Sequence, residues 1–187
     1  MGLRLPHRRP LRPPGRTRLV AIAAERWSRS LLHAGVLAAP YHAGLEHAVR
    51  RTIQDQFLSD HVSCVVATSA FGMGIDKPNV RLVIHLGLST SLESYYQEAG
   101  RAGRDGRPGH CEVLWNRADV RLARLIVPDV RKLDPLLRYV TSVGCRRHLL
   151  LRHFGEYLRE CNGCDRCAKW PSFWKGREVW KRGRKAA

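Results

Sequence analysis

Apolar residues along the chain alternate between short continuous runs and patterns with helical spacing. Four runs have the length and composition of strands in a parallel sheet: 36–39, 62–67, 81–85 and 111–115. Residues 19–34 and 45–57 instead carry apolar positions at helical spacing, and Gly35 stands where the first helix would stop. Residues 91–99 are a third candidate helix, with Ser91 as its cap. This alternation predicts an α/β domain with a mostly parallel sheet flanked by helices.

After about residue 117 the pattern changes to helices only. Apolar positions recur at helical spacing in three segments, 120–126, 133–140 and 150–158, and Gly144 precedes the last of them. We therefore expect an α/β domain over residues 19–116 and a small helical subdomain over residues 117–168. The buried strands 62–67 and 81–85 should be covered on both faces of the sheet.

The positive charge is concentrated at the two ends of the chain. The formal net charge is +17, and residues 1–18 contain six arginines and no acidic residue. We expect residues 1–18 to be a disordered basic arm. Residues 169–187 form a basic tail with tryptophans at 170, 174 and 180. These ends favour a polyanion, most often nucleic acid, although basic tails can simply be solvated and the tryptophans can pack rather than stack on bases.

The composition excludes two classes of protein. Hydrophobic residues make up 44% of the chain and charged residues 26%, as in a globular protein. No apolar run approaches the roughly 20 residues that cross a bilayer. The first 18 residues lack the apolar centre of a secretory signal. We therefore expect no membrane partner and a cytoplasmic, reducing compartment.

Four of the six cysteines have the spacing of metal ligands. Cys145 is followed by a C-x-x-C-x-x-C run formed by Cys161, Cys164 and Cys167. Four thiolates around one ion make a closed tetrahedral Zn²⁺ site, which is structural rather than catalytic. An iron–sulfur cluster is the alternative, although the C-P of the bacterial ferredoxin pattern is missing. The other two cysteines, Cys64 and Cys111, are expected to be inert thiols in the core.

A second candidate site lies in residues 97–106. Arg101 and Arg104 stand three apart among Gly100, Gly103 and Gly106. Glycines let the backbone approach a ligand closely, and a guanidinium can stabilise the charge of a transferring phosphoryl group. On composition alone, a polar helix end that runs into a turn explains the same residues.

Several motifs occur in a characteristic order along the chain. They are Tyr-His-Ala-Gly-Leu at 41–45, Ala-Thr-Ser-Ala-Phe-Gly-Met-Gly-Ile-Asp-Lys-Pro at 67–78, Ser-Tyr-Tyr-Gln-Glu-Ala-Gly-Arg-Ala-Gly-Arg-Asp-Gly at 94–106, Gly-Cys-Arg-Arg at 144–147 and Phe-Gly-Glu at 154–156, followed by the cysteine run. Together they closely resemble the RecQ family of superfamily 2 DNA helicases. The resemblance covers about residues 36–168. It implies the second RecA-like motor lobe followed by a helical zinc-binding subdomain.

The resemblance assigns roles to single residues. Residues 67–78 look like helicase motif V, in which Thr68 would touch a DNA phosphate and Gly74 and Asp76 would lie near the nucleotide. His42 and Lys77 would be further contacts to DNA. Residues 97–104 look like motif VI, in which Gln97 and Arg101 would sense bound nucleotide and Arg104 would be the arginine finger that reaches the γ-phosphate. Members of the family step 3′ to 5′ along DNA in repair and recombination.

The departures from the family pattern matter as much. The 187 residues contain no Gly-x-x-x-x-Gly-Lys-Ser/Thr phosphate loop and no Asp-Glu-x-His motif, both of which belong to the first lobe. We therefore expect ATP with Mg²⁺ to bind only together with a first motor lobe, which could be separately encoded, and no hydrolysis by this chain alone. Single-stranded or partly duplex DNA is the expected partner, near the bacterial nucleoid. The alternatives are a non-catalytic, zinc-containing DNA-binding module and a truncated gene product.

Overall fold

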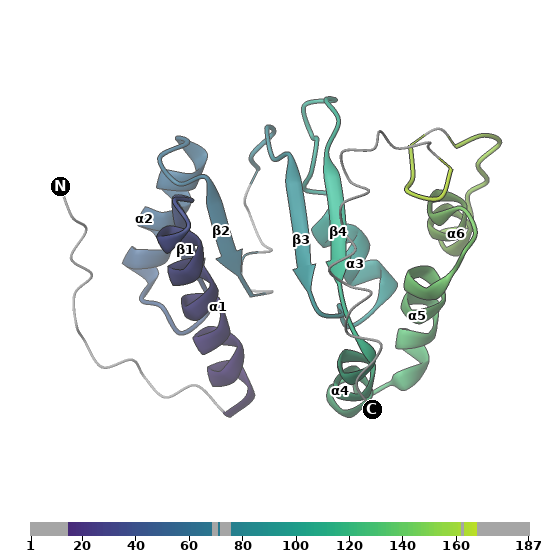
Figure 1. Cartoon of the computed structure of the whole chain (residues 1–187), viewed down its shortest axis with the longest axis horizontal. Helices are drawn as coiled ribbons and strands as arrows, with labels where there is room; N and C mark the ends of the chain where they lie inside the picture. The colour runs from purple at the N-terminus through teal and green to yellow at the C-terminus, as the bar shows by residue number, and fades with distance from the viewer. Residues whose placement is uncertain (1–14, 69–70, 72–75, 162, 168–187) are drawn as a thin grey trace. The chain divides into compact units, whose positions relative to one another are not determined.

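The computed structural model describes residues 15–68, 71, 76–161 and 163–167, with side chains from residue 21 onward. The chain divides into two compact units, Met1–Lys77 and Pro78–Ala187, which we call the first and second units. Each unit contains one pair of parallel strands with helices packed beside it (Figure 1). Among the described residues, no helix is long and apolar enough to cross a membrane.

The first unit packs helices against two parallel strands. Its elements are α1 (Gly15–His33), β1 (Ala38–Tyr41), α2 (His47–Leu58) and β2 (Cys64–Ala67). Ala38 lies opposite Cys64 and Tyr41 opposite Ala67 in the strand register. The apolar faces of the helices supply the core, with these residues buried: Ala21, Ala24, Ile53 and Phe57.

The end of α1 explains why β1 begins later than expected. Gly35 has a φ of +84°, a left-handed conformation that glycine adopts without steric cost. The N–H of Val36 then turns back to the carbonyl of Leu31 at 2.9 Å. Val36 therefore closes the helix instead of opening the strand, and the expected strand 36–39 is observed at Ala38–Tyr41. The helix itself starts at Gly15, within the segment expected to be a disordered arm.

The second unit begins with a parallel β–α–β crossover. β3 (Leu82–Leu86) pairs with β4 (His110–Leu114), and α3 (Leu92–Ala99) connects them. The side chain of Ser91 accepts a hydrogen bond from the backbone N–H of Ser94 at 3.1 Å, which confirms the expected helix cap. Leu92 and Tyr95 point from α3 into the core.

The expectation that residues 81–85 are covered on both faces is wrong for β3. Val83 and His85 are partly buried, whereas Leu82, Ile84 and Leu86 are each about half exposed. His85 contacts Tyr95 of α3, with 5.0 Å between the ring centroids. Successive side chains of a strand point to opposite faces, so α3 covers one face of β3 and leaves the other open within the second unit.

The helices that follow this crossover form two buried clusters, one of which they share with α3. They are α4 (Arg117–Ile126), the short 3₁₀ helix η2 (Val130–Lys132), α5 (Leu133–Thr141) and α6 (Arg146–His153). Leu136, Tyr139 and Val140 of α5 form one buried cluster with Leu92 and Tyr95 of α3. The expected boundary at residues 116 and 117 therefore falls inside one compact unit.

The last helix is shorter than its apolar spacing predicts. α6 ends at His153, so Leu158 lies outside it. Gly155 has a φ of +81°, and the N–H of Glu156 bonds to the carbonyl of Leu151 at 2.9 Å. The helix thus ends just before Gly155, and the segment that carries the cysteine run follows it.

Candidate functional site

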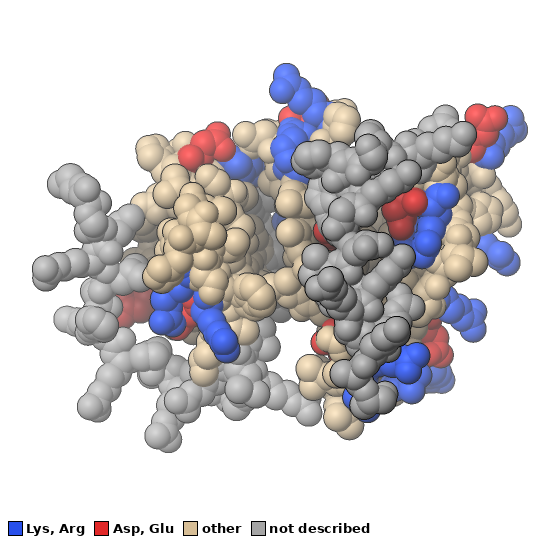
Figure 2. Space-filling model, viewed as in Figure 1, with Lys and Arg blue, Asp and Glu red and all other residues tan. Residues whose placement is uncertain are grey.

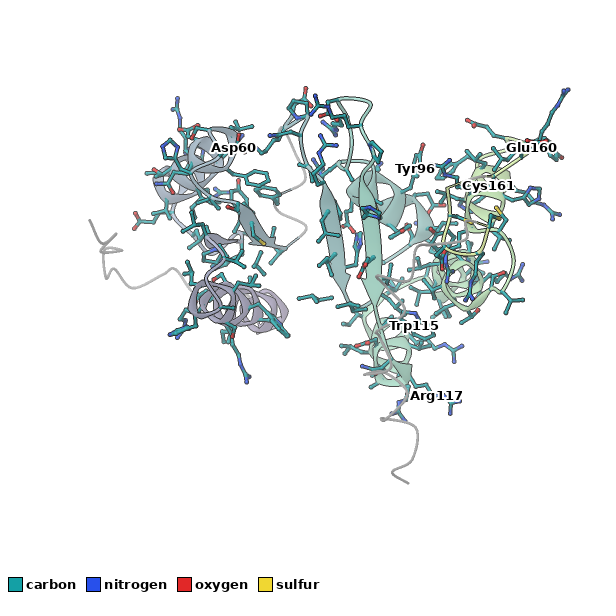
Figure 3. The ribbon with its side chains drawn as sticks, turned by 45° about the horizontal axis from the view of Figure 1, so that its top comes forward. Asp60, Tyr96, Trp115, Arg117, Glu160 and Cys161 are labelled. Carbon is teal, nitrogen blue, oxygen red and sulfur yellow. The ribbon has the colours of Figure 1, made fainter. Side chains whose placement is uncertain are left out.

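The four expected metal ligands come together in the second unit. Cys145 caps α6, and Cys161, Cys164 and Cys167 lie in the loop that follows it, where Figure 3 labels Cys161. All four sulfur atoms lie within 4.8 Å of one another. The sulfurs of Cys145 and Cys164 are 3.8 Å apart. Tetrahedral Zn²⁺ with Zn–S bonds of about 2.3 Å holds its sulfurs about 3.8 Å apart, so this arrangement fits one zinc ion.

The same spacing decides between zinc and an iron–sulfur cluster. A cluster places several iron and sulfide atoms between its cysteines, and therefore needs the four thiolates to be farther apart than one ion does. The observed sulfurs converge on the space of a single ion. The site is a structural Cys₄ Zn²⁺ site.

The pKa values of Cys164 and Cys167 are shifted in opposite directions. Burial by itself would raise the pKa of its thiol, but backbone hydrogen bonds from Arg166 and Arg146 and the contact with Cys167 lower that pKa to about 6. The pKa of Cys167 is raised to about 12, because its thiol shares hydrogen bonds with Cys145 and Cys164. Without an ion the cluster thus keeps protons that Zn²⁺ must displace, and the affinity for zinc falls as the pH falls.

Arg146 ties the zinc loop to the helical core. Its Nε lies 2.8 Å from a carboxylate oxygen of Asp165, which stands between two of the cysteines. Its Nη1 donates to the carbonyl of Tyr139 at 2.5 Å, and its guanidinium lies 5.6 Å from the ring centroid of that residue. The spacing of the cysteines gave no signal for this contact.

The glycine–arginine segment forms the end of α3 and the turns that follow. Gln97 is exposed on the helix, Arg101 is half-buried and Arg104 is exposed. The Nε of Arg104 lies 3.5 Å from the carbonyl of Gly100, at the C-terminal end of α3. The three expected motif VI residues thus lie at the end of α3 and in the turn after it, within the second unit.

Two glycines are required where this segment turns. The N–H of Gly103 bonds to the carbonyl of Val80 at 2.9 Å, which holds the turn against the start of β3. Gly103 has a φ of +70°, and a Cβ atom there would lie 2.5 Å from the carbonyl oxygen of Arg107. A Cβ on Gly109 would lie 2.8 Å from that of Ala102. The backbone conformation of the arginine-bearing turn therefore depends on these glycines.

Arg81 clamps the same turn from the strand side. Its guanidinium pairs with the carboxylate of Asp105 and donates to the carbonyls of Arg107 and Pro108, each at 3.3 Å. Sequence reasoning missed this residue. Arg81 and Asp105 are 24 positions apart, and only the parallel crossover brings them together.

Glu98 fixes the last turn of α3 to β3. Its carboxylate accepts hydrogen bonds from His85 Nε2 and Ser89 Oγ, both at 2.9 Å. Burial would raise the pKa of Glu98, but these two bonds and the charge of Arg101 lower it below its usual value. Glu98 is therefore an anion beside Arg101. The sequence pattern did not single out Glu98 or its contacts with His85 and Ser89.

The expected motif V residues are only partly described. Gly74 lies outside the described residues. Thr68 follows β2, is half-buried, and its N–H bonds to the carbonyl of Tyr41 at 3.0 Å, while Asp76 is exposed. Lys77 is buried, and its ammonium donates to Asp60 at 2.7 Å and to the carbonyl of Leu58 at 3.3 Å. The ammonium of Lys77 is thus paired with a carboxylate of the first unit.

His42 is also buried, with 4% of its surface exposed. Its Nε2 lies 3.3 Å from the carboxylate of Glu25 on α1. A Cβ on Gly44 would lie 3.2 Å from the Nδ1 of His42. Both side chains, His42 and Lys77, are thus buried within the first unit, and their contact with DNA stays a prediction.

Comparison with known families matches two successive parts of the chain. Residues 16–106 match the helicase conserved C-terminal domain, and residues 127–168 match the RecQ zinc-binding region. The second match contains all four cysteines of the metal site. A crystal structure of the yeast DEAD-box splicing factor Prp28 shares the fold, with a TM-score of 0.51 and 21% identity over 74% of this chain and 27% of that one.

Curated relatives agree with these matches. The ATP-dependent DNA helicase RecQ of Haemophilus influenzae is 44% identical over 163 residues, which are 81% of this chain and 26% of that protein. RecQ of Bacillus subtilis is 40% identical over 77% of this chain and 26% of that protein. The helicase wrn-1 of Caenorhabditis elegans is 44% identical over 72% of this chain and 14% of that protein. The chain thus spans about a quarter or less of the length of these relatives. With its RecA-like α/β fold and its Cys₄ zinc site, the chain belongs to the RecQ family, of which it carries the helicase C-terminal domain and the zinc-binding region.

Proposed function

We propose that this chain supplies the second motor lobe of an ATP-dependent 3′–5′ DNA helicase used in DNA repair and recombination. The observation that carries the proposal is the turn that bears Arg101 and Arg104. Arg81, the backbone of Val80 and two required glycines hold its backbone, while the side chain of Arg104 is exposed. A guanidinium on a rigid turn suits the stabilisation of charge on a phosphoryl group that is bound elsewhere.

In this proposal the nucleotide is gripped by a first motor lobe. The 187 residues contain no phosphate loop, so Mg²⁺ and ATP bind only when that lobe is present. Gln97 and Arg101 sense the bound nucleotide, and Arg104 reaches the γ-phosphate. Gly74 and Asp76 couple the nucleotide site to DNA. The chain alone does not turn over ATP, because an arginine finger without a held phosphate has nothing to stabilise.

DNA is the proposed polyanionic partner, as single strands or partly duplex substrates. Thr68 contacts a backbone phosphate from the end of β2. His42 and Lys77 act indirectly, because their buried side chains position the loops that carry the motifs. We place the protein in the bacterial cytoplasm with the chromosomal DNA.

We assign the parts of the chain accordingly. Residues 19–116 are the motor lobe and residues 117–168 the zinc-binding subdomain, with basic segments before and after them. The zinc ion contributes folding free energy to a loop that has little apolar core of its own. Its chemistry is structural, since four thiolates leave no open coordination position.

Mixing two lobes tests this function. The purified, zinc-loaded chain is assayed for ATP hydrolysis with and without single-stranded DNA, alone and with the first motor lobe of the Haemophilus influenzae RecQ helicase. We expect no hydrolysis by either piece alone and DNA-stimulated hydrolysis by the mixture. Robust hydrolysis by this chain alone would contradict the proposal, as would a mixture no more active than its parts at saturating concentrations.

A further inference from the structure

Three arginines of α4 lie on one side of the helix. Arg117, Arg121 and Arg124 are spaced four and three residues apart and are all exposed. With 3.6 residues per turn, they fall within about 60° around the helix axis and span about 10 Å along it. We call these three residues the arginine stripe. Figure 3 labels Arg117 at the start of α4, at the edge of the second unit.

Local structure fixes the direction of the arginine stripe. Ala123 of α4 and its C-cap residue Val127 pack with the fully buried Leu133, and Ala123 lies about 100° around the helix axis from Arg124. At the start of α4, the side chain of Asn116 accepts hydrogen bonds from the N–H groups of Ala118 and Asp119, and the carboxylate of Asp119 accepts one from the N–H of Asn116 at 2.7 Å. The helix therefore cannot roll to hide the stripe without losing its core contacts and its cap.

The helix dipole favours Arg124, which lies in the last turn of α4, but helix stability does not account for Arg117 and Arg121. Arg117 is the first residue of α4, where the helix dipole favours an acid and disfavours a cation. Arg121 follows it at i+4 and Arg124 follows Arg121 at i+3, so each neighbouring pair repels. In the described part of the chain, none of the three forms an ion pair with a carboxylate.

Further positive charge lies close by in the sequence. Arg131 and Lys132 of η2 are exposed, and Arg131 is paired with Asp129 at 3.1 Å. In Figure 2, Lys and Arg side chains are visible at the lower right, over the region of α4 and α5. Three guanidiniums over about 10 Å match a ligand with closely repeated negative charge.

We propose that the arginine stripe binds the phosphodiester backbone of DNA, at a place outside motifs V and VI. The phosphates of one strand of B-DNA repeat about every 3.4 Å along the axis, so the stripe spans three to four of them. Each guanidinium can hold a phosphate with two parallel hydrogen bonds. The inference rests on the proposed function only in taking DNA, rather than an acidic protein, as the polyanion.

Salt dependence of DNA binding tests the stripe directly. The full chain with zinc bound is titrated by fluorescence anisotropy against a labelled single strand and a labelled duplex at several salt concentrations. The test variant is R117Q/R121Q/R124Q. The matched control is R26Q/R29Q/R51Q, which removes three exposed arginines of the first unit and the same net charge.

The expected result is a change in the slope of log K against log salt. Loss of three phosphate contacts should flatten that slope by about 2 for the single strand or about 2.7 for the duplex. The control should flatten it much less. Equal slopes for the two variants, or unchanged slopes on both DNAs, would overturn the proposal, and the second outcome is the one expected if the stripe serves an acidic protein.

Thermal unfolding of the parent chain and the triple variant shows whether the variant is folded. Because the three arginines repel one another in the free chain, the triple variant should melt at or above the temperature of the parent. If it does not fold, R121Q and R124Q are titrated singly, and each should flatten the single-strand slope by about 0.7. No change in either would also overturn the proposal. The assay contains no nucleotide and no first lobe, so its outcome is independent of the ATP hydrolysis test.

Discussion

Three glycines around the arginine-bearing turn allow its backbone strain to be measured in separate parts. At Gly103 both a left-handed φ of +70° and a carbonyl oxygen 2.5 Å from a built Cβ oppose any side chain. At Gly106 only the conformation does, because φ is +79° and nothing lies within 4 Å of a Cβ. At Gly109 only the close approach does, since a Cβ would lie 2.8 Å from that of Ala102. Alanine at each position therefore isolates one cost or combines the two.

The magnitudes follow from these contacts. A left-handed conformation costs a residue with a Cβ about 1–2 kcal/mol, which is the expected loss of unfolding free energy for G106A. Overpacking costs about 1–3 kcal/mol, which is the expectation for G109A. G103A bears both costs, so it should lose about 2–5 kcal/mol. Arg107 is held through its own carbonyl by Arg81, so the oxygen that a Cβ would meet cannot move without breaking that clamp.

Chemical denaturation of the zinc-loaded chain and its three variants measures these losses. The difference between G103A and G106A is the cost of the close approach alone, and it should exceed about 1 kcal/mol. If G103A is no less stable than G106A, the carbonyl of Arg107 does not enclose the turn as described. The rigid presentation of Arg104 would then lose its structural basis.

Three further predictions concern the remainder of the second unit. Removal of zinc by a chelator, or C164S, should lower the melting temperature markedly, whereas C111S should not, because Cys164 is one of the four zinc ligands and Cys111 is not. Equal losses in C164S and C111S would refute the metal assignment. Hydrogen bonds from Ser91 and His153 lower the pKa of Glu93 from 4.5 to about 2. The ionised Glu93 therefore stabilises the folded chain above pH 4.5, and this stabilisation is lost as the pH falls toward 2. The same part of the pH dependence of stability should vanish in E93Q. R81D should destabilise the chain by about 1 kcal/mol, and R81D/D105R should restore part of that loss in a denaturant titration if the ion pair matters.

Much of the fold could be predicted because local patterns agree with it. Helical spacing, Gly35 as a stop and Ser91 as a cap each locate an element within a few residues. The cysteine spacing located the whole metal site, because a metal-binding run of cysteines is a signal that needs no tertiary context. The order of the motifs indicated the family for the same reason.

The remaining features depend on contacts between distant segments. Residues 81–85 read as a strand covered on both faces, but an apolar run does not say how many layers a unit places over it. The motif spacing could not show that Lys77 is buried against Asp60. Nor could it show that Arg81 holds the turn at Asp105, since both contacts are made by the folded chain rather than by sequence neighbours.

The central claim is that Arg104 acts on a triphosphate held by another lobe. ATP hydrolysis by the two-lobe mixture with single-stranded DNA tests it when R104A is compared with R107A, a change in an exposed neighbour on the same turn. We predict that R104A lowers the turnover number by about 1,000-fold or more and leaves the melting temperature of the chain unchanged, while R107A turns over like the parent. Parental turnover by R104A in the mixture would contradict the account.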